Sequence, residues 1–194
     1  MGTLREGGVA AKKGKENWTV RERETVLETP WFTIVRNTCE VPGGTIVPSY
    51  YVQHDKDAVM VLVVDAKGRV LLEEQYRFPI DRISYDYPAG SVEPGDRSLV
   101  AAARRELEEE TGLRARKLEK LFSMDKNPSS TASRMHVFLV REFGPGQKED
   151  NPAERVRSRF YTPAEILRMV ERGRLSCVFC LAATFYLARR FRWK

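Results

Sequence analysis

The sequence AGSVEPGDRSLVAAARRELEEETGL, residues 89–113, decides the fold prediction for this chain. It opens as a loop broken by glycine and proline and continues into an alanine-rich run that favours an α-helix. Gly112 predicts the end of this helix, because glycine is the usual residue just past a helix C-terminus. Within the helix, Leu99, Ala103 and Leu107 share one face and can pack inward.

Acidic side chains follow one face of the predicted helix. Glu106 and Glu110 are four residues apart, so their carboxylates lie one above the other, and Glu109 is three residues from Glu106. A glutamate-rich helix commonly presents a solvated face, here paired with Arg104 and Arg105. However, carboxylates at this spacing repel one another unless a cation neutralises them, and hard oxygen ligands suit Mg²⁺ or Mn²⁺. With backbone carbonyls from the preceding loop, the pattern indicates a candidate divalent-metal site for phosphate chemistry.

These residues resemble the signature of the Nudix family, G-x5-E-x7-R-E-U-x-E-E-x-G-U, in which U is a bulky aliphatic residue. The second half is matched at every fixed position, by Arg105, Glu106, Leu107, Glu109, Glu110, Gly112 and Leu113. The first half departs from the pattern, because Asp96 replaces the glutamate expected after Gly90, and eight residues rather than seven separate it from Arg105. We place the extra residue between Gly95 and Ser98, with Ser98 as the helix N-cap, so that the metal-binding half keeps its register.

The resemblance implies an α+β fold, a Nudix-type α/β/α sandwich with a mixed sheet. It also implies that Glu106, Glu109 and Glu110, with the carbonyl of Ala89, hold Mg²⁺ or Mn²⁺ against a pyrophosphate. Arg105 would orient the carboxylates by ion pairing. Arg105 and the three glutamates are therefore the expected catalytic residues.

Two further segments are similar to the Nudix pyrophosphatases that act on ADP-ribose and nucleotide sugars. Residues 74–78 (EQYRF) resemble a segment of that group, which implies that Arg77 binds substrate phosphates with its planar guanidinium. Residues 18–56 predict an antiparallel β element, similar to the N-terminal sheet that forms a dimer in that group and lends residues to the partner's substrate pocket. We therefore expect a homodimer in which Trp31 contacts the substrate; a plain edge sheet is the alternative.

Downstream of the signature the resemblance is incomplete. Many ADP-ribose pyrophosphatases carry a glutamate, acting as general base or metal ligand, in the loop equivalent to residues 125–134. This chain has no glutamate there, so the sequence assigns no general base. Glu154 precedes the last predicted strand, as an acidic residue does in the family, and is expected at the substrate and metals; a solvent-exposed side chain is the alternative.

The remaining patterns predict the rest of the domain. Apolar and alternating runs predict strands at residues 58–64, 69–74, 118–124 and 135–143. Thr162 followed by Pro163 predicts a helix N-terminus, and a final apolar helix begins near Ser176. We divide the chain into a disordered tail at residues 1–17, an N-terminal β subdomain at 18–56 and a Nudix domain at 57–194.

The amino-acid composition limits the possible binding partners and the cellular compartment of the protein. The net charge of +6 permits binding of polyanions, but nucleotides qualify as readily as nucleic acid. The three cysteines form no disulfide framework and favour a reducing compartment, and Cys177 and Cys180, a lone C-x-x-C, are expected to be buried free thiols rather than a zinc or redox site. The longest apolar run, residues 175–188, is too short to span a bilayer of about 30 Å. We expect a soluble, cytoplasmic protein.

The sequence therefore predicts Mg²⁺-dependent hydrolysis of a nucleoside diphosphate linked to another moiety, ADP-ribose or a nucleotide sugar, to a nucleoside monophosphate and a sugar phosphate. One alternative is a Nudix hydrolase of nucleoside triphosphates, dinucleoside polyphosphates or capped RNA. Another is a non-catalytic, nucleotide-binding regulator. A basic RNA-binding module is a third, disfavoured because no aromatic and basic RNA motif is present. The sequence leaves the distal group of the substrate open.

Overall fold

The computed structural model describes residues 16–149 and 155–193, which belong to two compact units. Unit 1 contains the chain up to Asp55 together with Ser129–Thr131, and unit 2 contains Lys56–Pro128 and the chain from Ala132 onward. All but the last two residues of the expected N-terminal tail lie outside the described ranges.

Unit 1 is an antiparallel sheet in the order β1-β2-β3, formed by β1 (Thr19–Glu28), β2 (Phe32–Glu40) and β3 (Ile46–Asp55). This confirms the predicted N-terminal antiparallel element. The distant segment Ser129–Thr131 joins it, since the Tyr50 hydroxyl donates to the Ser129 carbonyl at 2.7 Å and Gln53 forms a parallel bridge with Thr131. Every residue of β1 is exposed, so this sheet has only a small core of its own.

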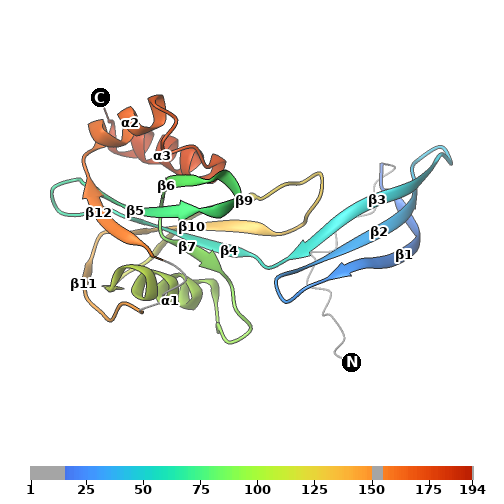
Figure 1. Ribbon diagram of the computed structural model, residues 1–194, viewed down its shortest axis with the longest axis horizontal. Helices are drawn as coiled ribbons and strands as arrows, with labels where there is room; N and C mark the ends of the chain where they lie inside the picture. The colour runs from blue at the N-terminus through green and yellow to red at the C-terminus, as the bar shows by residue number, and fades with distance from the viewer. Residues whose placement is uncertain (1–15, 150–154, 194) are drawn as a thin grey trace. The chain divides into compact units, whose positions relative to one another are not determined.

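The centre of unit 2 is a mixed sheet in the order β7-β4-β10-β9 (Figure 1). Its strands are β4 (Ala58–Val63), β7 (Ala89–Ser91), β9 (Glu119–Asp125) and β10 (Arg134–Val140). β4 runs parallel to β10 and antiparallel to β7, and β10 runs antiparallel to β9. All six residues of β4 are buried, which explains its continuous apolar sequence.

Two smaller sheets contain the other strands among the described residues of unit 2. An antiparallel sheet in the order β12-β5-β6 contains β5 (Val70–Arg77), β6 (Arg82–Asp86) and β12 (Arg157–Tyr161), and the short 3-10 helix η1 (Phe78–Ile80) joins β5 to β6. A second pairing joins β8 (Leu113–Ala115) to β11 (Phe143–Pro145). Two expectations were wrong in detail: residues 89–91 form a strand rather than a loop, and the strand predicted at 135–143 is divided between β10 and β11.

The α-helices in the described residues of unit 2 are α1 (Leu99–Thr111), α2 (Pro163–Glu171) and α3 (Val178–Phe191). α1 begins after Ser98, whose Oγ accepts a hydrogen bond from the Ala101 amide at 3.1 Å, and it ends at Gly112 with a φ of 71°. Both ends are those that the sequence predicted. Thr162 and Glu165 form a reciprocal capping box at the start of α2.

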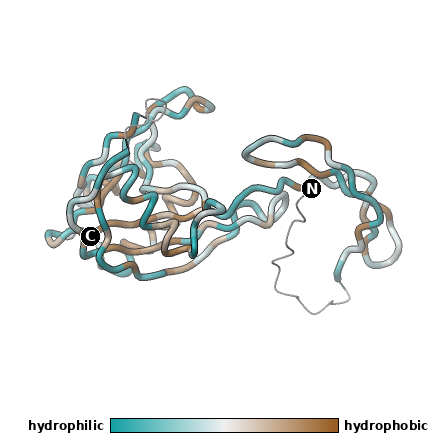
Figure 2. Tube along the Cα trace, turned by 90° about the horizontal axis from the view of Figure 1, so that it is seen from below, coloured by the Kyte–Doolittle hydropathy of each residue, from teal (hydrophilic) through white to brown (hydrophobic). Residues whose placement is uncertain are grey.

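Helices cover both sides of the sheets, with α1 below and α2 and α3 above in Figure 1. Alternate residues of β4 therefore enter two cores: Val59 packs with Leu107 of α1, and Met60 packs with Ile166 of α2 and Leu187 of α3. Figure 2 shows apolar segments crossing the interior of unit 2. This arrangement confirms the α+β, α/β/α sandwich. In the described part of the chain, no helix has the length and apolar character needed to cross a membrane.

Candidate functional site

Strand β7 and helix α1 approach each other closely at Gly90. Gly90 pairs with Val59 at the start of β4 and faces the carboxylate of Glu106. A Cβ atom added at Gly90 would lie only 2.2 Å from Cδ of Glu106, a distance that real Cβ contacts do not show. A glycine at this signature position is therefore required to leave room for the Glu106 carboxylate.

Arg105 connects two carboxylates of α1 to strand β7. Its Nη1 lies 2.8 Å from Oε1 of Glu106 and 2.9 Å from Oε2 of Glu109. Its Nη2 donates to the carbonyl of Ser91, at the end of β7, at 3.0 Å. One guanidinium thus contacts two glutamates of α1 and the end of β7.

Asp96, which replaces the glutamate of the family signature, accepts hydrogen bonds from Nε and Nη2 of the Arg105 guanidinium. Nε of Arg105 donates to Oδ1 at 3.2 Å and Nη2 donates to Oδ2 at 3.0 Å. The amide of Glu93 also donates to Oδ2 at 2.8 Å, and the Asp96 side chain is only 7% exposed. Hydrogen bonding by Arg105 lowers the pKa of Asp96. The additional residue between Asp96 and Arg105 therefore does not prevent these two side chains from forming a bidentate ion pair.

The local charge is negative around this network. Three carboxylates, those of Asp96, Glu106 and Glu109, surround the single guanidinium of Arg105. Burial raises the pKa of Glu106, and the charge of Arg105 opposes that rise. The excess of carboxylates over guanidinium favours the binding of a cation.

Glu110 lies one helical turn beyond Glu106 and reaches the same strand. Its Oε2 accepts a hydrogen bond from the amide of Ala89 at 3.0 Å. The structure therefore brings Ala89, Glu106, Glu109 and Glu110 to one region of unit 2. The donor atoms of the three glutamates do not all lie within 4.8 Å of one another, because Arg105 binds the first two and the Ala89 amide binds Glu110.

Arg77 lies at the end of β5, beside this region. Its Nε and Nη2 donate to Oδ2 of Asp86, at the end of β6, at 3.2 and 3.1 Å. Arg77, Asp86 and Ala89 line one cavity of about 470 Å³, together with Met60 and other residues of unit 2. The predicted phosphate-binding arginine therefore shares a cavity with a predicted metal-binding residue.

The other predicted site residues are not placed at this centre. Trp31 lies in the turn between β1 and β2 of unit 1 and is 76% exposed. Glu154 lies outside the described residues. In the loop at 125–134, Asp125 pairs with Arg134, with 3.2 Å between Oδ1 and Nε.

Glu73 and His136 are buried titratable groups that the sequence analysis missed, as it missed Asp86. Glu73 on β5 is 4% exposed, and burial raises its pKa to about 7. His136 on β10 lies between two partners, with 2.7 Å from Nδ1 to the Ser123 hydroxyl and 3.0 Å from Nε2 to Oδ2 of Asp57. The sequence does contain a signal for both groups. Each is a polar or charged residue inside a mainly apolar strand, VLLEEQYR for Glu73 and RMHVFLV for His136.

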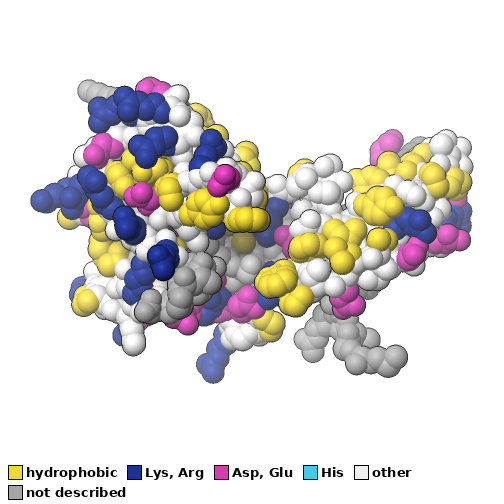
Figure 3. Space-filling view, viewed as in Figure 1, with side chains coloured by type: hydrophobic (Ala, Val, Ile, Leu, Met, Phe, Trp, Pro, Cys, Tyr) yellow, Lys and Arg dark blue, Asp and Glu magenta, His cyan; other side chains and the backbone are white. Residues whose placement is uncertain are grey.

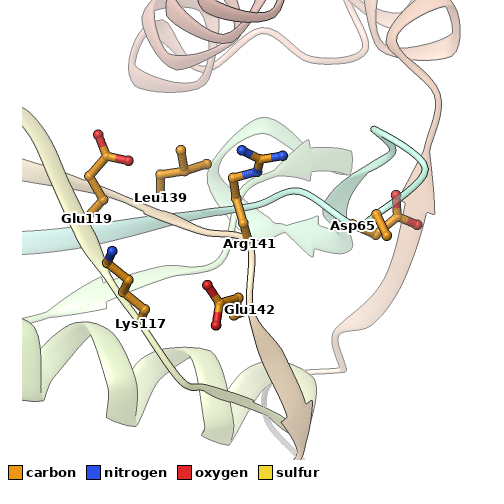
Figure 4. A pocket seen from close by; sticks show the side chains of 7 residues that line it. Asp65, Lys117, Glu119, Leu139, Arg141 and Glu142 are labelled. Carbon is orange, nitrogen blue, oxygen red and sulfur yellow. The ribbon is translucent and has the colours of Figure 1, made fainter.

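A further cavity, of about 410 Å³, lies at the opposite ends of β4 and β10 (Figure 4). In Figure 4 Arg141 lies centrally, with Lys117 and Glu119 to one side and Asp65 to the other. Charges of both signs line it, and no residue of the signature does. We assign it no role in the chemistry.

Comparison with known proteins places these observations in a family. Residues 54–177 match the family model of the NUDIX domain, and residues 18–53 match that of the nucleoside diphosphate sugar hydrolase N-terminal domain. The chain is 30% identical over 155 residues to the ADP-ribose pyrophosphatase of Mycobacterium tuberculosis, a match that covers 78% of this chain and 74% of that protein.

Two other similarities agree with this. The chain is 38% identical over 103 residues to the ADP-ribose pyrophosphatase of Bacillus subtilis, a match that covers 53% of this chain and about half, 55%, of that relative. A crystal structure of an ADP compounds hydrolase has the same fold, with a TM-score of 0.76, 21% identity, and coverage of 93% of this chain and 96% of that one. The chain belongs to the Nudix hydrolase family.

Proposed function

We propose that this chain hydrolyses the pyrophosphate bond of a nucleoside diphosphate linked to a sugar, with ADP-ribose as the first candidate. The products would be a nucleoside monophosphate and a sugar phosphate. The observation that carries the proposal is the network in which Arg105 holds Glu106 and Glu109 against β7. The names of the relatives and of the matching N-terminal domain support the substrate class.

Glu106, Glu109 and Glu110, with the carbonyl of Ala89, would hold Mg²⁺ or Mn²⁺. The fit rests on hard oxygen donors, on the excess of carboxylates around Arg105, and on the space that Gly90 leaves beside Glu106. When bound, such an ion would neutralise charge on the phosphate oxygens and lower the pKa of a bound water.

The residues of the chain have separate tasks in this proposal. Arg105 orients the carboxylates, and Asp96 orients Arg105 through its bidentate pair. Arg77, which Asp86 holds by two hydrogen bonds, would bind a substrate phosphate from the wall of its cavity. A cavity of about 470 Å³ lies within the range of small-molecule sites. The described residues leave the general base unassigned.

We also propose that the protein is a cytoplasmic homodimer formed through unit 1. Large apolar side chains are exposed on its strands and turns, namely Val26, Leu27, Trp31, Ile46 and Tyr51. Figure 3 shows hydrophobic side chains at the surface of unit 1 on one face. Exposed apolar surface of this kind favours burial against a second copy. Trp31 would then contact the substrate, and Glu154 would assist the metals. Light scattering on the full chain should give twice the monomer mass of 22.3 kDa; a monomer at micromolar concentration would contradict the dimer.

A substrate panel tests the activity. Turnover with Mg²⁺ is measured for ADP-ribose, several nucleotide sugars, NADH, a dinucleoside polyphosphate and nucleoside triphosphates, and the products are separated by ion exchange. Selective cleavage of the diphosphate-linked sugars supports the proposal. Faster cleavage of triphosphates or dinucleoside polyphosphates would assign another Nudix substrate class. Tight nucleotide binding with no turnover would overturn catalysis and indicate a regulator.

A further inference from the structure

Asp86, Cys177 and Cys180 bring one carboxylate and two thiols together in the wall of the Arg77 cavity. Their donor atoms all lie within 4.8 Å of one another, and no other such group of three His, Cys, Asp or Glu residues occurs in residues 16–149 and 155–193. We propose that this group is a binding site for a thiophilic divalent cation, with Zn²⁺ as its occupant. The site lies outside the family signature.

The distances agree with tetrahedral zinc. Zn–S bonds of about 2.3 Å and Zn–O bonds of about 2.0 Å separate a thiolate and a carboxylate oxygen on one ion by about 3.5 Å. Sγ of Cys180 lies 3.6 Å from Oδ1 of Asp86, so one edge of the tetrahedron is already present. Two thiolates on one ion lie about 3.8 Å apart, and the donor atoms of all three residues lie within 4.8 Å of one another, so the two distances from Cys177 need to shorten by at most about 1.3 Å to complete the third corner.

Both thiols lie at the N-terminus of α3. Cys177 is the N-cap of α3, and Cys180 lies in its first turn, where backbone amides have no partner within the helix. The thiolate is the form that binds metal, so binding of Zn²⁺ would displace the protons of both thiols.

The carboxylate is held in place and the charge is balanced. Arg77 binds Oδ2 of Asp86, and the Ser84 hydroxyl lies 3.2 Å from Oδ1. Such outer contacts orient metal ligands. Two thiolates and one carboxylate around Zn²⁺ leave one net negative charge, which the guanidinium of Arg77 balances.

The burial pattern differs from the expected pair of buried thiols. Cys180 is buried, but Cys177 is only half-buried and lines the cavity. The cavity therefore provides an access route and room for a water molecule as fourth ligand. Thiolates select Zn²⁺ over Mg²⁺, so this site is chemically distinct from the glutamates of α1.

Cobalt substitution tests the site directly. The full-length chain is reduced, freed of metal with a chelator, supplied with excess Mg²⁺ and titrated anaerobically with Co²⁺. We expect the near-ultraviolet charge-transfer absorption of a cobalt thiolate, which saturates at one ion per chain and disappears when one equivalent of Zn²⁺ is added. C177S and C180S should each lose the absorption, whereas Cys39→Ala, which changes a cysteine of unit 1, should retain it.

Absence of the absorption in the unmodified chain, or its persistence in the C177S/C180S double variant, would overturn the proposal. If the variants do not fold, alkylation of the unmodified chain by iodoacetamide provides a second measurement. Zn²⁺ should slow alkylation of Cys177 at least about tenfold, since a bound thiolate is no longer a free nucleophile. An unchanged rate would overturn the site. Neither measurement uses turnover, so both are independent of the proposed pyrophosphatase activity.

Discussion

Arg105 and Asp96 form a bidentate pair, with 3.2 Å between Nε and Oδ1 and 3.0 Å between Nη2 and Oδ2. Because the same guanidinium binds Glu106 and Glu109, Asp96 positions two carboxylates through Arg105. We expect Asp96→Ala to lower turnover about 10- to 100-fold, as loss of groups that orient metal ligands commonly does. Steady-state kinetics across a Mg²⁺ titration measures this effect.

Arg97→Ala changes the exposed neighbour of Asp96 and provides a matched control. It should leave turnover and the Mg²⁺ dependence unchanged. If Asp96→Ala behaved like this control, the positioning role of Asp96 would be wrong.

Gly90→Ala should impair the site by steric overlap. The added methyl group would lie 2.2 Å from Cδ of Glu106, so the carboxylate or the strand must shift. We expect turnover to fall at least about tenfold. Gly95→Ala is the control, because a Cβ there meets no atom within 4 Å. Equal turnover of the two variants would show that the Gly90–Glu106 approach has no role in activity.

Arg77→Lys should weaken substrate binding. Lysine cannot reproduce the bidentate hydrogen bonding of a guanidinium, so we expect KM for ADP-ribose to rise about tenfold, with a smaller change in kcat. Arg82→Lys is the control, because Arg82 lines the same cavity and donates to the Ser176 hydroxyl at 3.0 Å. An unchanged KM in Arg77→Lys would argue against phosphate binding by Arg77.

Glu73 should make stability depend on pH. Burial raises its pKa to about 7 from an ordinary value of 4.5, so between these values the folded chain binds more protons than the unfolded chain. The free energy of unfolding should therefore fall as pH rises through this range. Glu73→Gln should remove up to roughly 3 kcal/mol of this fall, at about 1.4 kcal/mol per pKa unit.

Denaturant titrations at pH 5 and pH 8 measure the difference. Glu74→Gln, at the next position of β5, is the control and should keep the pH dependence of the unmodified chain. An identical pH dependence in Glu73→Gln would show that the Glu73 carboxyl does not titrate in this range.

Local chemistry explains which elements were predictable. The ends of α1 follow from single residues: Ser98 caps the N-terminus, and Gly112 adopts the positive φ that ends the helix. Strand β7 was not predicted, because its three residues, Ala-Gly-Ser, have low strand propensity and pair only through the distant strand β4. Tertiary pairing rather than local preference determines such a strand.

The same distinction applies to the site. Helical spacing predicted that Glu106 and Glu110 share a face, because that relationship lies within one element. Spacing could not show that Asp96 completes the pairing of Arg105, since this depends on the loop before α1. Nor could it show that Cys180 meets Asp86, because β6 and α3 meet only in the folded chain.

The most direct test of the central claim is turnover of ADP-ribose by Glu110→Gln at saturating Mg²⁺. The substitution keeps the size of the side chain and an oxygen that can accept from the Ala89 amide, so the melting curve should not change. Turnover should fall at least about a hundredfold, because a metal ligand should matter no less than the residues that orient it. Glu108→Gln changes a glutamate of the same helix that pairs with Arg114 of β8, and this variant should stay active. Near-normal turnover by Glu110→Gln would contradict the assignment of the catalytic metal to α1.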